Sequence, residues 1–210
     1  MQLTIHHLSF ERNNILLFNQ ICCALQPGSL CEIRGVNGSG KSTLLRILGG
    51  FIEPQEGAIC WEGVSIFKQR DLYQQQTCFI GHQNGVKPYL TVYENLALSC
   101  LLAGNNPKKI SLETALTKIG LLHAIHKPTF QLSAGLARRL ALARLIIQPA
   151  KLWILDEPTT ALDAAGQQLL NDLLHQHLAK GGIAMIATHQ DLPKTQDAQT
   201  LWLGDGARQS

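Results

Sequence analysis

Residues 35–42 read Gly-Val-Asn-Gly-Ser-Gly-Lys-Ser, and this stretch decides how the rest of the chain is interpreted. It fits the pattern G-x-x-x-x-G-K-[ST] and lies between a strand-like run, Leu30–Arg34, and a helical pattern, Ser42–Leu48. Glycines let the backbone wrap closely around phosphate groups, so that successive N–H groups point inward at the start of a helix. The stretch therefore predicts a phosphate-binding loop between a strand and a helix.

This loop supplies a cation and a hydroxyl in addition to its backbone donors. Lys41 adds a positive charge for the β- and γ-phosphates, and the Ser42 hydroxyl is a hard oxygen ligand suited to Mg²⁺. The residues expected to contact the phosphates are Gly35, Val36, Asn37, Gly38, Ser39, Gly40, Lys41, Ser42 and Thr43. By itself the loop indicates only that the protein binds a nucleoside triphosphate.

A second apolar run, Leu152–Leu155, ends in the two carboxylates Asp156 and Glu157. The ends of strands are where α/β sheets present catalytic groups. Asp156 is suited to hold Mg²⁺ through water, and Glu157 is then free to polarise an attacking water. In isolation the pair would be interpreted as a cap of the following helix. Beside a phosphate loop, the catalytic interpretation is favoured.

The segment Leu132–Leu136 reads Leu-Ser-Ala-Gly-Leu and opens a helix rich in Ala, Arg and Leu. Ser133 is a suitable N-cap, and Gly135 lets an anion approach the first free N–H groups. A capped helix start is the commonest explanation of such a segment. Its position favours a functional role, because it lies after the phosphate loop and shortly before the acidic strand, which is the run that ends in Asp156 and Glu157.

Three single polar residues complete the pattern. Gln83 and His189 each follow a short apolar strand, and Asp163 ends the segment Thr160-Ala161-Leu162-Asp163. Taken singly, each is most simply an ordinary loop residue, because a histidine at a strand end is more often hydrogen-bonded than catalytic. Together and in this order, they indicate one site.

The order of apolar patterns predicts an α/β core interrupted by a helical insert. The expected strands are Leu3–Leu8, Ile15–Phe18, Ile21–Leu25, Leu30–Ile33, Gly57–Trp61, Val64–Phe67, Thr77–Ile80, Leu152–Leu155 and Ile183–Thr188. The expected helices are Ser42–Leu48, Tyr93–Leu102, Leu112–Ile119, Leu136–Ile147 and Gly166–Ala179.

Composition narrows the class of protein. The 210 residues carry a net charge of +3, and the densest basic cluster is Arg138–Arg139, so no nucleic-acid arm is expected. Six scattered cysteines without a C-x-x-C pair indicate reduced thiols. The most apolar stretch, Leu96–Ala103, is much shorter than the roughly 20 residues of a membrane span, and residues 1–7 lack the pattern of a secretory signal. We expect a cytosolic or membrane-peripheral protein.

With these motifs in this order, the sequence resembles the ATP-binding cassette family over nearly its whole length. The matching motifs are Walker A at Gly35–Thr43, the Q-loop residue Gln83, the signature Leu132–Leu136, Walker B at Leu152–Asp156 with Glu157, the D-loop ending at Asp163 and the switch histidine His189. The resemblance implies an α/β P-loop NTPase fold with an N-terminal antiparallel β part and a helical subdomain. We expect a single nucleotide-binding domain over residues 1–210, with 87–148 as the helical subdomain and 1–86 and 149–210 as the β part and core.

The resemblance also implies a mechanism in which two copies face each other head to tail. Each ATP is then held between the Walker A loop of one copy and Ser133, Ala134 and Gly135 of the other, with Asp163 beside it. Glu157 would activate water, His189 would contact the γ-phosphate, Gln83 would sense and help to bind Mg²⁺, and Lys41 would complete the catalytic set. The cofactors implied are ATP and Mg²⁺.

Two positions depart from the family pattern. Many family members carry an aromatic residue that stacks on adenine. In this sequence the corresponding position falls near Arg12, and Phe10 is close by. Arg12 could stack its guanidinium plane on the base, or Phe10 could substitute. Leu136 replaces the Gln usual at the end of the signature, and we expect catalysis to survive this change because Ser133 and the Gly135 N–H remain.

Within the family, several local phrases resemble the ATP-binding subunits of haem export and cytochrome c maturation systems. They are 81–83, 90–96, 132–145, 152–158 and 188–190. The resemblance implies a homodimer bound to integral membrane permease subunits at the cytoplasmic face of the bacterial inner membrane, with no nucleic-acid partner and no direct haem binding. The alternatives are the ATPase of another small-molecule transporter and a soluble mechanoenzyme that acts on nucleic acid or ribosomes.

Overall fold

A parallel sheet forms the centre of the computed structural model, which describes residues 2–107, 111–189 and 198–204. The strand order is β6-β7-β8-β3-β9, and the neighbouring strands pair in parallel. The strands are β3 (Leu30–Gly35), β6 (Thr77–Ile80), β7 (Leu152–Asp156), β8 (Ile183–Ala187) and β9 (Ala198–Leu203). All five residues of β7 and of β8 are buried, as expected for parallel strands that are covered on both faces.

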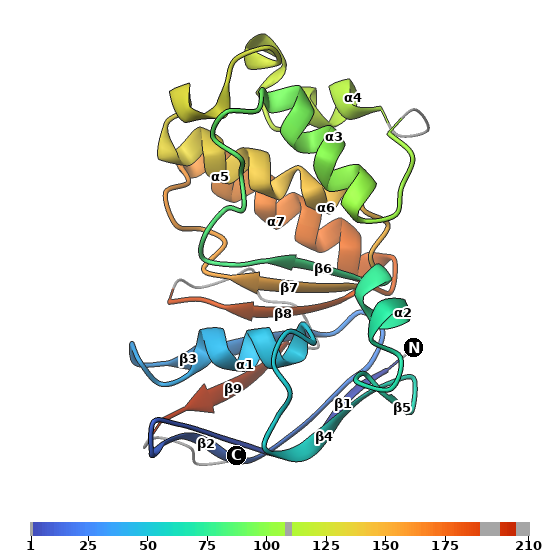
Figure 1. The fold of residues 1–210 in the computed structure, drawn as a ribbon, viewed down its shortest axis with the longest axis vertical. Helices are drawn as coiled ribbons and strands as arrows, with labels where there is room; N and C mark the ends of the chain where they lie inside the picture. Colours follow the sequence, from blue (N-terminus) through green and yellow to red (C-terminus); the bar gives the residue numbers. More distant parts are fainter. Residues whose placement is uncertain (1, 108–110, 190–197, 205–210) are drawn as a thin grey trace.

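A second, antiparallel sheet lies below the first, and helix α1 (Lys41–Leu48) packs between the two (Figure 1). Its order is β2-β1-β4-β5, with β1 (Leu3–Arg12), β2 (Ile15–Leu25), β4 (Glu56–Trp61) and β5 (Val64–Ser65). Leu44, Leu45 and Leu48 of α1 are fully buried in the core cluster shared by both sheets. The phosphate loop is thereby attached to a helix that is held from two sides.

Helices α3 to α7 lie over the opposite face of the parallel sheet (Figure 1). They are α3 (Val92–Leu102), α4 (Leu112–Lys118), α5 (Ala134–Leu142), α6 (Arg144–Ile147) and α7 (Ala164–Ala179), with the 3₁₀ turns η1 (Leu122–Ala124) and η2 (Thr129–Gln131). Helices α3 to α6 share a core cluster of their own and all fall within residues 87–148. No helix in the described part of the chain combines the length and the hydrophobicity of a membrane span.

The structure corrects several predicted boundaries. One long strand, β2, replaces the two strands expected over Ile15–Leu25, because the chain continues pairing with β1 through irregular register and a left-handed Gln20. The helix expected over Leu136–Ile147 is two helices that meet at Ala143. The strand expected over Val64–Phe67 is shortened to β5.

Two further elements were not predicted. They are α2 (Arg70–Gln75) and the edge strand β9.

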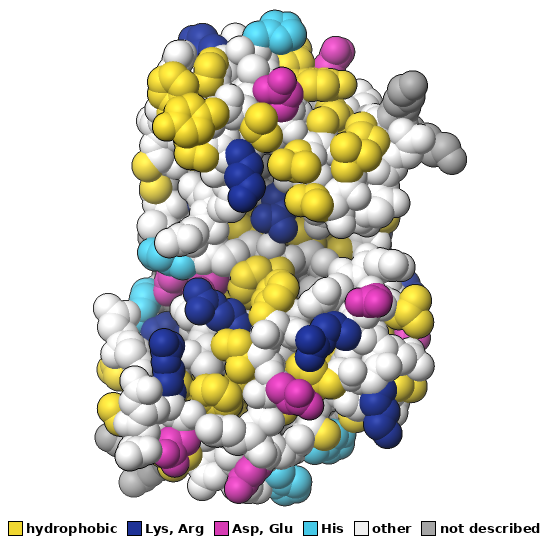
Figure 2. All heavy atoms as spheres, viewed as in Figure 1, with side chains coloured by type: hydrophobic (Ala, Val, Ile, Leu, Met, Phe, Trp, Pro, Cys, Tyr) yellow, Lys and Arg dark blue, Asp and Glu magenta, His cyan; other side chains and the backbone are white. Residues whose placement is uncertain are grey.

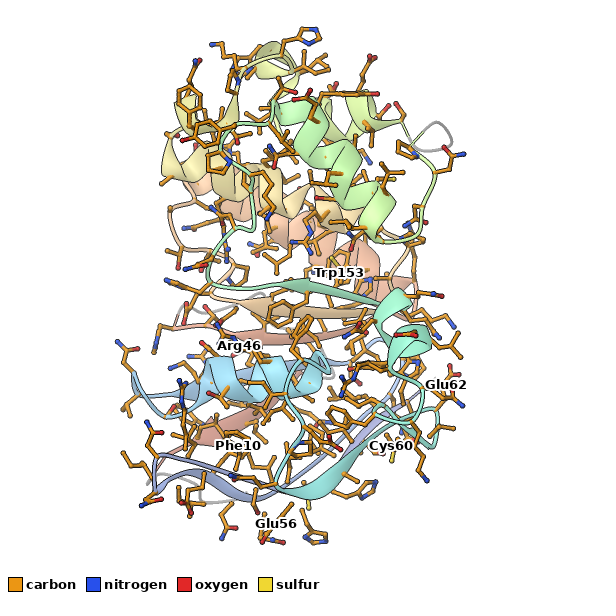
Figure 3. The ribbon with its side chains drawn as sticks, in the orientation of Figure 1. Phe10, Arg46, Glu56, Cys60, Glu62 and Trp153 are labelled. Carbon is orange, nitrogen blue, oxygen red and sulfur yellow. The ribbon has the colours of Figure 1, made fainter. Side chains whose placement is uncertain are left out.

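An aromatic stack joins the parallel sheet to its helical layer. The rings of Trp153 on β7 and His177 on α7 lie parallel, with centroids 3.8 Å apart, and Figure 3 labels Trp153 beneath the helices. His177 Nε2 donates to the Ile183 carbonyl oxygen at 3.1 Å. A Cβ atom on Gly182 would lie 2.3 Å from the His177 ring, so this position accepts only glycine while the stack is in place. Burial lowers the pKa of His177, which favours the neutral ring.

We predict that His177 makes the free energy of unfolding depend on pH. Because its pKa is lowered from the ordinary value of 6.5, the unfolded chain binds more protons than the folded protein near and below that pH. Stability should therefore be lost as the pH falls through about 6.5. Urea denaturation at several pH values should show a flatter pH dependence for His177→Gln, while His175→Gln, on the exposed side of the same helix, keeps the wild-type slope. Equal slopes for all three proteins would contradict this role.

Candidate active site

The predicted phosphate loop forms the turn from β3 into α1. β3 ends at Gly35 and α1 begins at Lys41. The Lys41 side chain is only 8% exposed and folds back over the loop, where its Nζ donates to the carbonyl oxygens of Gly35 at 2.7 Å and Val36 at 3.1 Å. The ammonium group is thus held at the mouth of the loop, beside the N–H groups that open α1.

Glycine is required at two points of this loop. Gly40 is the N-cap residue of α1 and has a φ of 95°, a conformation that glycine adopts readily. No side chain caps this helix, so its first N–H groups stay open to a ligand. At Gly35, a Cβ atom would lie 2.4 Å from the Leu203 carbonyl oxygen on β9. The start of the loop therefore packs closely against β9, a strand that lies far from the loop in the sequence.

The two carboxylates lie at the end of β7, next to this loop. Asp156 is 5% exposed, and Glu157 follows it with a φ of 48°, a conformation that residues with a Cβ rarely adopt. The Glu157 backbone N–H donates to the Ala187 carbonyl oxygen at 2.8 Å. Its Oε1 atom is buried and accepts no hydrogen bond from the residues that the structure describes. Such an oxygen is available to accept a proton from a water molecule.

His189 closes the site from the end of β8. Its Nε2 lies 3.0 Å from Asn37 Oδ1 and 3.5 Å from Glu157 Oε1. The histidine thus touches both the phosphate loop and the acidic strand, although these are far apart in the sequence. Its side chain is half exposed, which leaves it free to reach a bound ligand.

These elements line a pocket of about 730 Å³ that is open to solvent, and its size suits a nucleotide. The predicted residues that line it are Arg12, Asn37, Gly38, Gly40, Lys41, Ser42, Thr43, Asp156, Glu157 and His189. Residues that were not predicted also line it: Asn13, Ile15, Leu17, His82 and Thr160. Ile15 is 63% exposed, and neither it nor Asn13 or Leu17 belongs to a motif that the sequence displays.

The two candidates for the adenine contact, Phe10 and Arg12, lie in different surroundings. Phe10 stacks against Phe18, with ring centroids 6.1 Å apart, and packs against the buried core of the two sheets. Phe10 is not among the residues that line the pocket, so this geometry gives no support to its proposed substitution for the missing aromatic residue. Arg12, at the end of β1, lines the pocket beside Ile15 and Leu17.

Several predicted residues do not line the pocket. Gln83 is exposed, and its neighbour His82 lines the pocket instead. Ser133 caps α5, accepting from the Leu136 N–H at 3.3 Å, while Ala134 is exposed and Gly135 packs against the Ala161 carbonyl. The loop residues Gly35, Val36 and Ser39 are also not among the residues that line the pocket, and Val36 is 73% exposed.

Asp163 also lies outside the pocket. It caps α7 by accepting from the Gly166 N–H at 2.9 Å, and it forms an ion pair with Arg139. Hydrogen bonding from Arg139 lowers the pKa of this carboxyl group. Its predicted contact with a nucleotide stays a prediction, because Asp163 is not among the residues that line this pocket.

Residues 18–160 match the family model described as ABC transporter. The chain belongs to the ATP-binding cassette (ABC) transporter family. Membership indicates that it binds ATP and acts as an ATPase. The pocket between the phosphate loop and the acidic strand is the place in this ABC chain where the geometry suits that activity.

Two curated relatives are similar to this ABC chain over most of their length. The cytochrome c biogenesis ATP-binding export protein CcmA of Vibrio parahaemolyticus is 44% identical over 190 residues, which cover 90% of this chain and 93% of the relative. The protein of the same name from Haemophilus influenzae is 41% identical over 194 residues, with 92% of each chain covered. A solved ABC ATP-binding protein from Pyrococcus furiosus has a TM-score of 0.82 at 25% identity, covering 96% of this chain and 98% of its own.

We predict that Arg12 contributes to ATP affinity by covering the base. A guanidinium on an aromatic face is worth about 0.5–1 kcal/mol at exposed sites, so Arg12→Ala should weaken ATP binding by roughly 2- to 5-fold. Fluorescent ATP titration measures this change. Lys68→Ala, which removes an exposed cation outside the pocket, is the matched control and should bind normally. Unchanged affinity in Arg12→Ala would show that the base is held elsewhere.

Proposed function

We propose that this protein is the ATP-hydrolysing subunit of a membrane complex for cytochrome c biogenesis, acting in haem export or in the release of a haem-loaded chaperone. The similarity to the two CcmA proteins supports the assignment to cytochrome c biogenesis. The observation that carries the catalytic part is the pocket in which Lys41, Asp156, Glu157 and His189 meet.

The same geometry supports a dimer, because the pocket is incomplete within one chain. The signature residues Ser133, Ala134 and Gly135 lie outside it, and the first two are exposed. Ser133 caps the start of α5, where free backbone N–H groups attract an anion. Two copies related by a two-fold axis would bring this helix start to the open pocket of the other copy and form two equivalent sites.

The roles of the side chains follow from their places in the pocket. Lys41 and the N–H groups of the loop bind the phosphates and stabilise charge that develops during transfer. Glu157, whose Oε1 accepts no hydrogen bond from the described residues, orients a water molecule and accepts its proton. His189 bridges the loop and the acidic strand and contacts the γ-phosphate. Gln83 follows β6 and is exposed, so it would reach the site only after a rearrangement of its loop.

The donor set of the pocket fits Mg²⁺. The Ser42 hydroxyl and the Asp156 carboxylate both line it, and hard oxygen donors are the ligands that Mg²⁺ prefers. Mg²⁺ usually retains waters and phosphate oxygens, so few protein ligands are needed. We propose that Ser42 and, through water, Asp156 hold the ion, which supplies charge neutralisation for the β- and γ-phosphates.

A membrane partner is proposed to dock on the groove between the helical part and the parallel sheet. Figure 2 shows this hollowed face, with apolar side chains gathered on the helical part above it. The groove has a volume of about 330 Å³ and is lined by Phe51, Phe79, Lys87 and Leu102, among others. Tyr89, which is 88% exposed, lies two residues after Lys87. We propose that the protein acts from the cytoplasmic face of the inner membrane through this contact.

We predict that Glu157→Gln binds ATP but does not turn it over. Loss of a general base lowers the rate by roughly 10²–10⁴-fold, while the phosphate loop is untouched. Phosphate release assays and size-exclusion chromatography with ATP should show an inactive protein that accumulates as an ATP-bound dimer. Glu113→Gln, on the exposed face of α4, serves as the control. Hydrolysis at the wild-type rate in Glu157→Gln would remove the catalytic assignment.

We further predict that a bacterial strain without this chain lacks mature c-type cytochromes. The wild-type gene should restore haem-stained cytochrome c, and Glu157→Gln should not. Membrane pull-downs should recover the chain with permease subunits and without nucleic acid. Normal cytochrome c in the deletion strain would contradict the proposed pathway and leave the ATPase assignment in place.

A further inference from the structure

Arg138 on α5 is a charged residue that is almost completely buried. It is 2% exposed and donates five hydrogen bonds through its guanidinium group. Nη2 donates to the carbonyl oxygens of Asp156 at 2.8 Å and Glu157 at 2.6 Å, and Nε donates to that of Pro158 at 3.2 Å. Three successive carbonyl groups at the end of the acidic strand are therefore held by one side chain.

The other arm of the guanidinium reaches a second strand end. Nη1 donates to the Gly81 carbonyl oxygen at 2.9 Å and to Asn84 Oδ1 at 3.0 Å. Gly81 and Asn84 flank His82 and Gln83 after β6. Arg138 thus connects the helix that begins at Ser133 with the ends of both β6 and β7. A lysine could not make these contacts, because its single nitrogen lacks the planar fork of five donors.

These contacts compensate for an unfavourable backbone at Glu157. A φ of 48° costs free energy in a residue with a Cβ and persists only where the surroundings hold it. The carbonyl of this residue receives the shortest of the Arg138 bonds, while its N–H is bonded to Ala187. With both backbone groups held, the carboxylate is directed into the pocket, where Oε1 accepts no hydrogen bond from the described residues.

The charges around Arg138 agree with this arrangement. Burial lowers its pKa, and the negative charges of Asp156 and Glu157 oppose that effect. An arginine stays protonated at any ordinary pH, so the buried cation remains beside the two carboxylates.

We propose that Arg138 is a positioning residue for hydrolysis. It holds the Glu157 backbone in its left-handed conformation, and it does so from the helix that begins at Ser133. This inference rests on the proposed catalytic role of Glu157. Arg138 is not among the described residues that line the pocket, and its contact with Glu157 is to the backbone, so it acts through the glutamate rather than on the nucleotide.

The test compares Arg138→Gln, Arg138→Lys and Glu157→Gln in the full-length protein. Arg138→Gln should lower kcat by about 10- to 100-fold, since a small misplacement of a catalytic group has an effect of this order. Its ATP affinity should stay within about twofold of wild type, because the phosphate contacts are intact. Like Glu157→Gln, it should accumulate as an ATP-bound dimer. Arg138→Lys keeps the charge and should retain an intermediate kcat.

The matched control is Arg144→Gln. Arg144, on α6, donates to the Phe79 carbonyl oxygen of β6 at 2.8 Å and so also ties the helical part to the sheet, but it does not contact the acidic strand. It should keep a kcat close to wild type. An equal loss in Arg144→Gln would show that any tether of this kind matters and would overturn the proposal.

Further outcomes decide the matter. A folded Arg138→Gln or Arg138→Lys with wild-type kcat overturns the proposal. A variant that loses both kcat and the ATP-bound dimer also overturns it, because the defect then lies in helix α5 rather than at Glu157. If neither variant folds, Arg138 is purely structural and the proposal falls. If Glu157→Gln itself hydrolyses ATP normally, the proposed function fails first.

Discussion

The parallel pairing of β7 and β8 is the constraint on which the site depends. Asp156 pairs with Ala187 in register, and Ala187 in turn lies opposite Ile33 on β3. Three chain segments that are distant in the sequence therefore end at the same level of the sheet. The phosphate loop, the two carboxylates and the histidine emerge side by side because their strands are level, and a shift of one pair along the strand would separate them.

The sequence could predict the parts of the site that depend on local pattern. A strand, a glycine-rich loop and a helix follow one another around Lys41, and the carboxylates end an apolar run, so both were found without a structure. Strand β9 and the short helix α2 were not, because β9 is stabilised by pairing with β3 and lacks a clear apolar alternation. The break between α5 and α6 at Ala143 carries no glycine or proline to reveal it.

Side-chain direction was the other limit of prediction. Phe10 and Arg12 lie on the same face by the alternation of a strand, yet one packs in the core and the other lines the pocket, because the pairing of β1 with β2 is irregular between them. Arg138, in the densest basic cluster of the chain, would be assigned to the surface on composition. Its burial follows from tertiary contacts with carbonyl groups, which no sequence pattern displays.

The place of β9 at the edge of the sheet has a consequence for the order in which the protein is made. Gly35, at the root of the phosphate loop, pairs with Leu203, near the end of the chain. A ribosome makes the loop well before it makes the strand that supports it. Until β9 has been synthesised and has paired with β3, the nascent chain carries a phosphate loop that lacks one of its supports. The complete loop therefore depends on a segment that is synthesised long after it.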